Sequence, residues 1–128
     1  MAKKFKDLKQ GDVVYYFYKM QIGDGFRELT LTSDFDYNQT WDEYSAQTDA
    51  FMGISVAKKD FGKSVVASRY EIWATSLEAL QKASQKYIQK ELDSIQKQID
   101  KLAQNMKFYE EKKENISKLL LQWIHSTT

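Results

Sequence analysis

The chain beyond residue 75 carries an apolar repeat that constrains the fold more than any other feature. Apolar residues recur there at alternating spacings of four and three, and no glycine or proline follows Gly62. The positions of this repeat, called the seam below, are Ile88, Leu92, Ile95, Ile99, Leu102, Met106, Tyr109, Lys113, Ile116, Leu120 and Trp123. A pattern that keeps its phase over several heptads is typical of a coiled coil. The sequence therefore predicts a long coiled-coil helix over 76–128.

The length of this helix implies that it needs a partner. At 1.5 Å per residue, a helix over 76–125 is about 75 Å long, whereas a domain of 70 residues has a radius of gyration of roughly 11 Å. The seam must therefore meet another helix, supplied by other copies of the chain or by a hairpin within it. Asn105 or Glu114-Asn115 are the bend sites for a hairpin. Because the repeat runs in phase through Asn105, we favour one helix that self-associates.

The residue types in the seam bear on the number of copies. Leu92, Ile99, Met106, Lys113 and Leu120 take the a positions, and the other seam residues take d. Isoleucine at d disfavours parallel dimers and favours trimers, tetramers or antiparallel pairs. Lys113 is the one charged seam residue, and it is expected to cost stability while limiting the register. A homo-oligomer is the predicted assembly.

The start of the helix has its own signal. Thr75-Ser76-Leu77-Glu78 matches a capping box, in which Thr75 accepts a hydrogen bond from a backbone amide and Glu78 reaches back. We therefore place the domain boundary here, with a small β domain over 1–75.

The segment over 12–75 has the alternation and residue types of β-strands. Strands are expected over 13–18, 26–32, 51–57 and 64–73. The first two form a hairpin over 12–33, with a tight reversal at 22–25. Four or five antiparallel strands fit a small curled sheet or an SH3-like barrel. The predicted class is α+β, a small antiparallel β domain followed by the long helix.

Acidic and aromatic residues alternate between these strands, with no lysine or arginine among them. Aromatic groups in a polar loop are typical of a protein-recognition surface. The alternative is a lid, in which Trp41 and Tyr44 close over the end of the sheet. The candidate partner-binding residues are Asp34, Asp36, Tyr37, Trp41, Asp42, Glu43 and Tyr44.

Catalytic and metal sites have little support in the sequence. Asp34, Asp36 and Asn38 have the spacing that opens a calcium loop, but Gln39 and Ser45 stand where such a loop needs glycine and glutamate. There is no cysteine, and the one histidine has no clustered partners. We therefore expect no catalytic residue, no metal and no cofactor, and a protein that is not an enzyme.

Two other binding functions stay open. Tyr16 and Tyr18 share one strand face and follow the lysines of the segment 3–9, as in a face that stacks single-stranded nucleic acid. The net charge of +1 argues against this alternative, because nucleic-acid binders need a strong positive field. The other alternative is an oligomer that sequesters a small ligand in pockets between protomers.

The sequence shows no targeting signal. No apolar region follows the charged first residues, and no stretch approaches the roughly 20 apolar residues that span a bilayer. We therefore expect a cytoplasmic protein with no membrane association, or a virion component if the chain is phage-encoded.

Two short segments carry a resemblance. The opening Phe5-Lys6-Asp7-Leu8-Lys9-Gln10-Gly11-Asp12-Val13-Val14-Tyr15 resembles the first strand of many small proteins from phages and gut bacteria. The stretch 72–80 is similar to the passage from last strand to C-terminal helix in such proteins. The resemblance implies a β domain followed by a helix, and an accessory or host-inhibitor role in a phage or mobile element. Together with the seam, it predicts a non-enzymatic, self-associating protein-interaction module.

Overall fold

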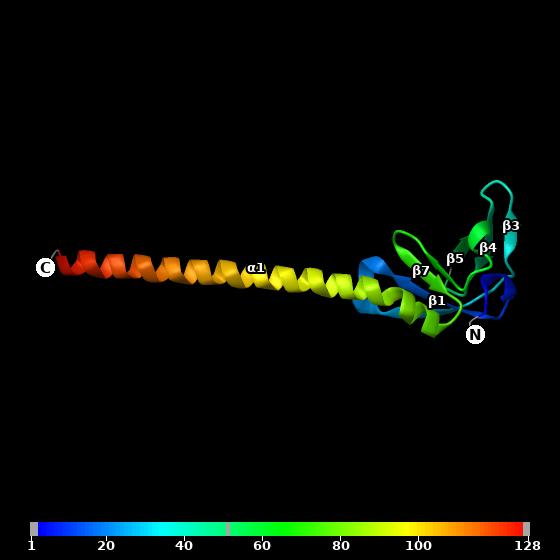
Figure 1. Cartoon of the computed structure of the whole chain (residues 1–128), viewed down its shortest axis with the longest axis horizontal. Helices are drawn as coiled ribbons and strands as arrows, with labels where there is room; N and C mark the ends of the chain where they lie inside the picture. Colours follow the sequence, from blue (N-terminus) through cyan, green and yellow to red (C-terminus); the bar gives the residue numbers. More distant parts are fainter. Residues whose placement is uncertain (1–2, 51, 127–128) are drawn as a thin grey trace. The chain divides into compact units, whose positions relative to one another are not determined.

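The computed structural model describes residues 3–50 and 52–126 (Figure 1). Within them, antiparallel strands form two sheets and are followed by one long helix, so the α+β class is confirmed. There are more strands than the four or five expected. They are β1 (Val13–Tyr18), β2 (Phe26–Thr30), β3 (Asp36–Asn38), β4 (Glu43–Gln47), β5 (Gly53–Ala57), β6 (Val65–Ala67) and β7 (Glu71–Ala74), and the helix is α1 (Leu77–Ser126).

The first sheet has the strand order β2-β1-β7-β6. The predicted hairpin over 12–33 is its centre, because β1 pairs with β2 from Val13↔Thr30 to Phe17↔Phe26. The reversal is longer than predicted. A 3-10 segment, η2 (Lys19–Asp24), connects the strands, and Gly25 ends it at a φ of 74°, in the left-handed region that glycine tolerates best.

The second sheet has the order β3-β4-β5. It contains the segment that we expected to be a loop, since β3 and β4 pair from Asp36↔Ser45 to Asn38↔Glu43. The third expected strand is present as β5, and the first residue of its predicted range, Phe51, lies outside the described residues.

The single strand expected over 64–73 is wrong. The segment forms the hairpin β6–β7, with a turn at Ser68 to Tyr70. The Ser68 amide donates to the Glu71 carbonyl, and the Ser68 hydroxyl accepts from the Glu71 amide at 3.2 Å. A serine that bonds its neighbouring backbone in this way closes a turn within a stretch whose composition otherwise favours a strand.

The core lies on both faces of β1. Val14 and Tyr16 belong to a cluster with residues of β2, β4 and β5, and Phe17 belongs to a second cluster with Ile72 and Leu80. β1 is covered on one side by the second sheet and on the other by the first turns of α1.

The cap of α1 differs by one residue from the prediction. The Ser76 hydroxyl accepts from the Ala79 amide at 3.2 Å, so Ser76 caps the helix. The Thr75 hydroxyl instead donates to the Lys3 carbonyl, which ties the end of the sheet to the chain's first described residues.

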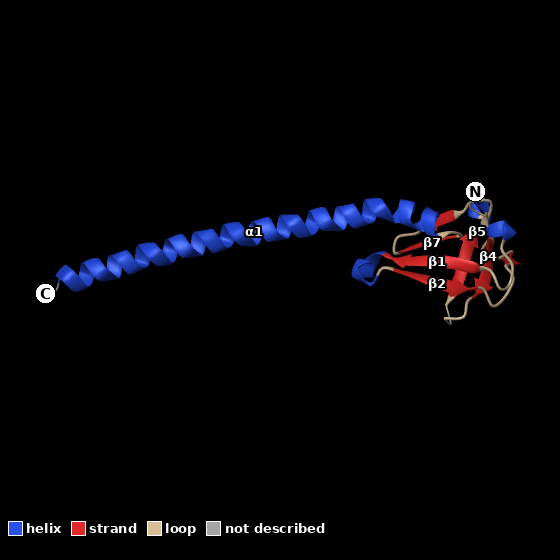
Figure 2. Ribbon diagram, turned by 90° about the horizontal axis from the view of Figure 1, so that it is seen from below, coloured by secondary structure: helices blue, strands red, loops and turns tan. Residues whose placement is uncertain are grey.

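Helix α1 is continuous over 50 residues, from Leu77 to Ser126 (Figure 2). The hairpin alternative, with its bend at Asn105 or Glu114-Asn115, is therefore wrong. The chain divides into two compact units between Ile88 and Gln89. The first three turns of α1 thus belong to the β unit, which extends past the boundary that we expected at residue 75. Along the described residues, no helix combines the length and apolarity needed to span a bilayer.

Candidate functional site

The seam of α1 is uncovered over most of its length. Every residue from Gln89 to Ser126 is exposed. The apolar seam side chains in this stretch are exposed by 43% at Ile95 to 67% at Leu102. In the core of the β unit, by contrast, large side chains such as Ile54 and Val56 are almost fully buried. The stripe from Leu92 to Trp123 is therefore the largest candidate interaction surface that the structure describes.

Ile88 differs from the other seam residues. It is half-buried and packs against the cluster that contains Phe17, Ile72 and Leu80. The sequence assigned it to an oligomer interface, whereas the structure places it on the surface of the β unit's own core. It lies where the covered part of α1 passes into the uncovered part.

The apolar stripe widens toward the end of α1. Leu119 and Ile124 occupy the g and e positions beside Leu120 and Trp123, and all four side chains are exposed by 44% or more. A stripe that includes e and g residues is wider than the surface that one partner helix covers in a simple two-stranded coiled coil. This end of the helix therefore offers more apolar surface than the rest of the seam.

The polar side chains beside the seam bond along their own helix. Gln89 and Gln96, at e positions, donate to Asp93 at 2.9 Å and to Asp100 at 3.0 Å. These bonds point the two amides toward the outer face of α1. Most of the flanking e and g positions are uncharged, and the charged ones are Glu91, Glu110 and Lys112.

The second candidate surface is the hairpin of β3 and β4. Its tip is built by Asn38, whose side-chain oxygen accepts from the Thr40 amide at 2.9 Å. Trp41 follows at the tip and is 73% exposed. The lid interpretation is therefore wrong for Trp41, which covers no part of either sheet.

Other residues of the hairpin have structural roles. Tyr44 stacks on Phe61 with ring centroids 3.7 Å apart, and Phe35 contacts the edge of Phe61. The Tyr37 hydroxyl donates a hydrogen bond to the Asp42 carboxylate at 2.5 Å. This bond helps to hold Asp42 at its positive φ of 49°. The half of the segment that faces Phe61 thus packs, and the half that carries Tyr37 and Trp41 faces solvent.

The acids of this segment do not converge on one point. Asp34 accepts a hydrogen bond from the Gln10 amide at 2.7 Å, whereas Asp42 accepts from Tyr37. Glu43 is half-buried and Asp36 is exposed. Within residues 3–50 and 52–126, no three metal-ligating side chains are grouped to hold an ion.

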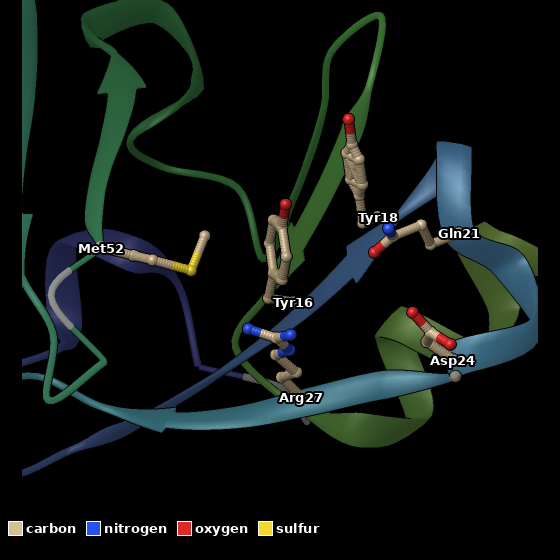
Figure 3. Close-up of a pocket in the computed structure, with 7 residues that line it drawn as sticks. Tyr16, Tyr18, Gln21, Asp24, Arg27 and Met52 are labelled. Carbon is tan, nitrogen blue, oxygen red and sulfur yellow. The ribbon is translucent and has the colours of Figure 1, made fainter.

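A hollow of about 280 Å³ lies beside β1 in the β unit (Figure 3). It is lined by Tyr16, Tyr18, Gln21, Asp24, Gly25, Arg27 and Met52. The pairing of β1 with β2 sets Arg27 directly opposite Tyr16. Sequence analysis missed this site, because only the pairing register and the η2 segment bring these residues together. Its one sequence signal was the shared face of Tyr16 and Tyr18.

The electrostatics of the hollow suit binding better than catalysis. Burial, reinforced by the neighbouring Glu71 carboxylate, raises the pKa of Tyr16 to about 12. Its hydroxyl is therefore a hydrogen-bond donor at neutral pH and a poor base. Tyr16 is also only 7% exposed, so its ring offers no free face for a nucleobase, contrary to the stacking role considered above.

A further aromatic and basic contact lies on the opposite side of β1. The Lys19 ammonium sits 3.9 Å from the ring centre of Tyr87 and donates to the Ser68 carbonyl at 2.5 Å. Lys19 lowers the pKa of Tyr87 by hydrogen bonding and by its charge, and Lys86 adds to this effect. The contact joins η2, the β6–β7 turn and α1 within the β unit.

Known proteins give no guide to the role of these surfaces. Neither a protein-family model, nor a curated protein, nor a solved structure matches this chain. The function must therefore be argued from the seam, the hairpin and the hollow themselves.

Proposed function

We propose that this chain is a non-enzymatic, self-associating interaction module, in which the seam of α1 joins copies of the protein. One observation carries the proposal: the heptad apolar residues from Leu92 to Trp123 are all exposed in the single chain. Monomeric proteins rarely expose apolar patches of more than a few hundred Å². A surface of this kind is expected to be covered by a partner.

The energetics favour a covered seam. Full burial of one leucine or isoleucine side chain stabilises a protein by about 1.5–3 kcal/mol. An uncovered helix also has little reason to persist, because most helical stability in proteins comes from packing of the apolar face. Pairing of the seam supplies this packing along the stretch that the β unit does not cover.

Another copy of the chain is the partner that fits the seam best. The heptad repeat keeps one phase over its whole length, so the seams of two copies can pair along all of it. The net charge of +1 leaves little repulsion between copies, and the flanking amides add none.

The hairpin of β3 and β4 is the surface that we propose for a second protein. Trp41 is an exposed aromatic anchor near the acidic Asp36 and Asp42. The Lys58 ammonium lies 5.8 Å from the ring centre of Tyr37, so the surface suits a partner that carries both charges. Several hairpins gathered by one bundle bind with avidity that no single hairpin has. An accessory or host-inhibitor role in a phage or mobile element is consistent with this arrangement and rests on the resemblance alone.

Sedimentation equilibrium on the full chain tests the proposal. We expect an oligomer at micromolar concentration, and dissociation to monomer when Ile99 and Met106 are both changed to glutamate. The matched control changes Gln104 and Lys107 to glutamate, because both are exposed on the same turns but lie off the seam. A monomer at tens of micromolar for the unmodified chain would refute the proposal.

Small-ligand binding is a second candidate function, supported by the hollow beside Tyr16. The charged side chains of Arg27 and Asp24 line it together, and no described residue forms an ion pair with either. We expect native mass spectrometry of the purified protein to show a retained small polar molecule, lost in Arg27→Ala and kept in the control Glu28→Ala. A chain of unmodified mass in all three samples would count against this function.

A further inference from the structure

An apolar groove of about 130 Å³ lies in the β unit, between η2 and the first turns of α1. Ile22 of η2 and Phe26 of β2 form one side, whereas Leu80, Ser84 and Ile88 of α1 form the other. The groove is partly open to solvent, since Phe26 is 45% exposed. Gln81 and Ser84 are the polar residues of its lining and the rest is apolar, so an apolar side chain is the chemistry that it accepts.

The groove and the heptad repeat share one residue. Ile88 lines the groove and is also the first d position of the repeat. A partner helix that packs on Ile88 therefore lies beside the groove that Phe26 and Ile22 also line. The other end of the seam has the opposite property, because Leu119 and Ile124 add apolar surface that a single facing helix leaves uncovered.

We propose that two copies pair antiparallel, so that the end of each α1, at Leu119 to Ile124, packs on the groove of the other. The inference rests on the proposed self-association and specifies its geometry. An antiparallel pair brings the widest part of one seam to the one place where the β unit adds apolar surface beside α1. It also agrees with isoleucine at d, which disfavours a parallel dimer.

The heptad fixes the register of this pair. In an antiparallel coiled coil each a residue packs against a d residue of the partner, and placing Leu120 against Ile88 sets every other layer. The resulting layers pair Leu92 with Ile116, Ile99 with Tyr109, Met106 with Leu102, and Lys113 with Ile95. The axis of symmetry then passes through Gln104, so that the g residue Asn105 meets its own counterpart.

Neighbouring registers use the surfaces less well. A shift of one heptad in one direction sets Leu120 against Gln81, a polar residue of the groove, and sets the charged Lys113 against Ile88. A shift in the other direction moves Leu120 to Ile95 and leaves Ile88 and the groove without seam residues opposite. A parallel bundle likewise leaves the groove of every copy uncovered.

Single cysteines test the inference cleanly, because the chain has none of its own. Asn105→Cys and Gln98→Cys both occupy g positions and are both exposed. With a short bismaleimide, we expect covalent dimers from Asn105→Cys and almost none from Gln98→Cys. In the proposed register the two Gln98 positions are offset by two heptads, about 21 Å along the axis, whereas Gln98 faces Lys112 of the partner. Mixing Gln98→Cys with Lys112→Cys should therefore restore the cross-link.

The outcomes separate this inference from the proposed function. Equal cross-linking at Asn105 and Gln98, in a protein that sediments as an oligomer, would indicate parallel helices and refute the antiparallel pair alone. A cross-link in a mixture of Gln98→Cys with Asn105→Cys, or of Asn105→Cys with Lys112→Cys, and none with Asn105→Cys alone would indicate a shift of one heptad and refute the register. A monomer by sedimentation would remove both the pair and the proposed function.

A second arm tests the occupation of the groove. Phe26→Gln removes an exposed part of the lining, and we expect it to weaken dimerisation by about tenfold, as the loss of a partly buried aromatic contact predicts. Met20→Gln is the control, since Met20 is 66% exposed in the same connection but does not line the groove. Circular dichroism checks that both variants fold. Equal affinity of the two variants would show that the groove is not occupied.

Discussion

The β unit and the stretch of α1 beyond Ile88 use similar side chains in opposite environments. Leucine, isoleucine and valine of the β unit, such as Leu31, Ile54 and Val56, are almost fully buried, whereas Ile99, Leu102 and Ile116 are more than half exposed. The β unit covers its own apolar groups because two sheets and the start of α1 enclose β1. The later helix is a single element with no second layer. Apolar residues are buried in one region and exposed in the other.

The division between these regions falls within a single helix. Leu80 and Ser84 of α1 are buried on the sheet, and about two turns later Leu92 is exposed. The first turns of this regular helix are thus part of the core of the β unit, and its later turns are exposed. Four changes to the chain test this division, in order of decreasing expected effect.

Truncation should have the largest effect. A chain that ends at Thr75 lacks Leu80 and Ile88, so we expect the second core cluster to be lost and the β unit to unfold. A chain that ends at Lys90 keeps both residues and should be a folded monomer. Amide dispersion in a nitrogen–proton NMR spectrum and light scattering distinguish the two. A folded chain ending at Thr75 would contradict the division.

Leu80→Ala and Leu102→Ala compare the same substitution in the two regions. Leu80 is 1% exposed, and its truncation should lower the unfolding free energy of the β unit by about 2–5 kcal/mol. Leu102→Ala should instead weaken self-association and leave the β unit within about 0.5 kcal/mol. Hydrogen exchange of the β1 amides measures the β unit by itself. Similar losses of protection in the two variants would refute the contrast.

Tyr16 should make the stability of the β unit depend on alkaline pH. Because burial and the Glu71 carboxylate disfavour the phenolate in the folded chain, the folded-state pKa of about 12 lies above the ordinary value of 10.0, and Tyr16 makes its full contribution to stability only below pH 10. This contribution, about 3 kcal/mol, is lost as the pH rises from 10 through 12. We expect the unfolding free energy, measured with denaturant, to fall with rising pH across this range in the wild type. In Tyr16→Phe this fall should be smaller. An unchanged pH profile in Tyr16→Phe would assign the effect to other groups.

Lys113→Leu should have the smallest effect and the opposite sign. Lys113 is the one charged seam residue, and an apolar side chain there completes the stripe. We expect association to tighten by about tenfold, or roughly 1.4 kcal/mol. Lys107→Leu, on the outer face of α1, is the control and should leave the affinity unchanged. Sedimentation at several concentrations gives both values, and tightening by Lys107→Leu would indicate unspecific apolar association.

Local sequence patterns predicted the secondary-structure elements whose apolar residues follow a single period. The hairpin over 12–33 and the long helix followed from alternation and from the heptad repeat. The predictions were wrong where a hydrogen bond between one side chain and the nearby backbone sets the end of an element. Ser68 turns a strand-like stretch into two strands, and Ser76 caps the helix in place of Thr75. The β3–β4 hairpin was not predicted, because its alternating aromatic and acidic residues are also typical of a recognition loop. The contact that packs Tyr44 is with Phe61, which lies outside the segment and could not be found from the segment itself.

The sequence by itself determined that a β-rich region precedes a helix with an apolar seam, because periods of two and of three and a half depend only on which side of the backbone each residue lies. Only the tertiary structure decided how far the β unit covers that helix, which tyrosines are buried, and which residues line the hollow and the groove. These properties depend on contacts between segments far apart in the chain, such as Tyr16 with Trp73 and Phe17 with Leu80. Local periodicity does not specify such contacts. The heptad repeat therefore predicts Ile88 as a seam residue, whereas in the structure it packs against the core of the β unit.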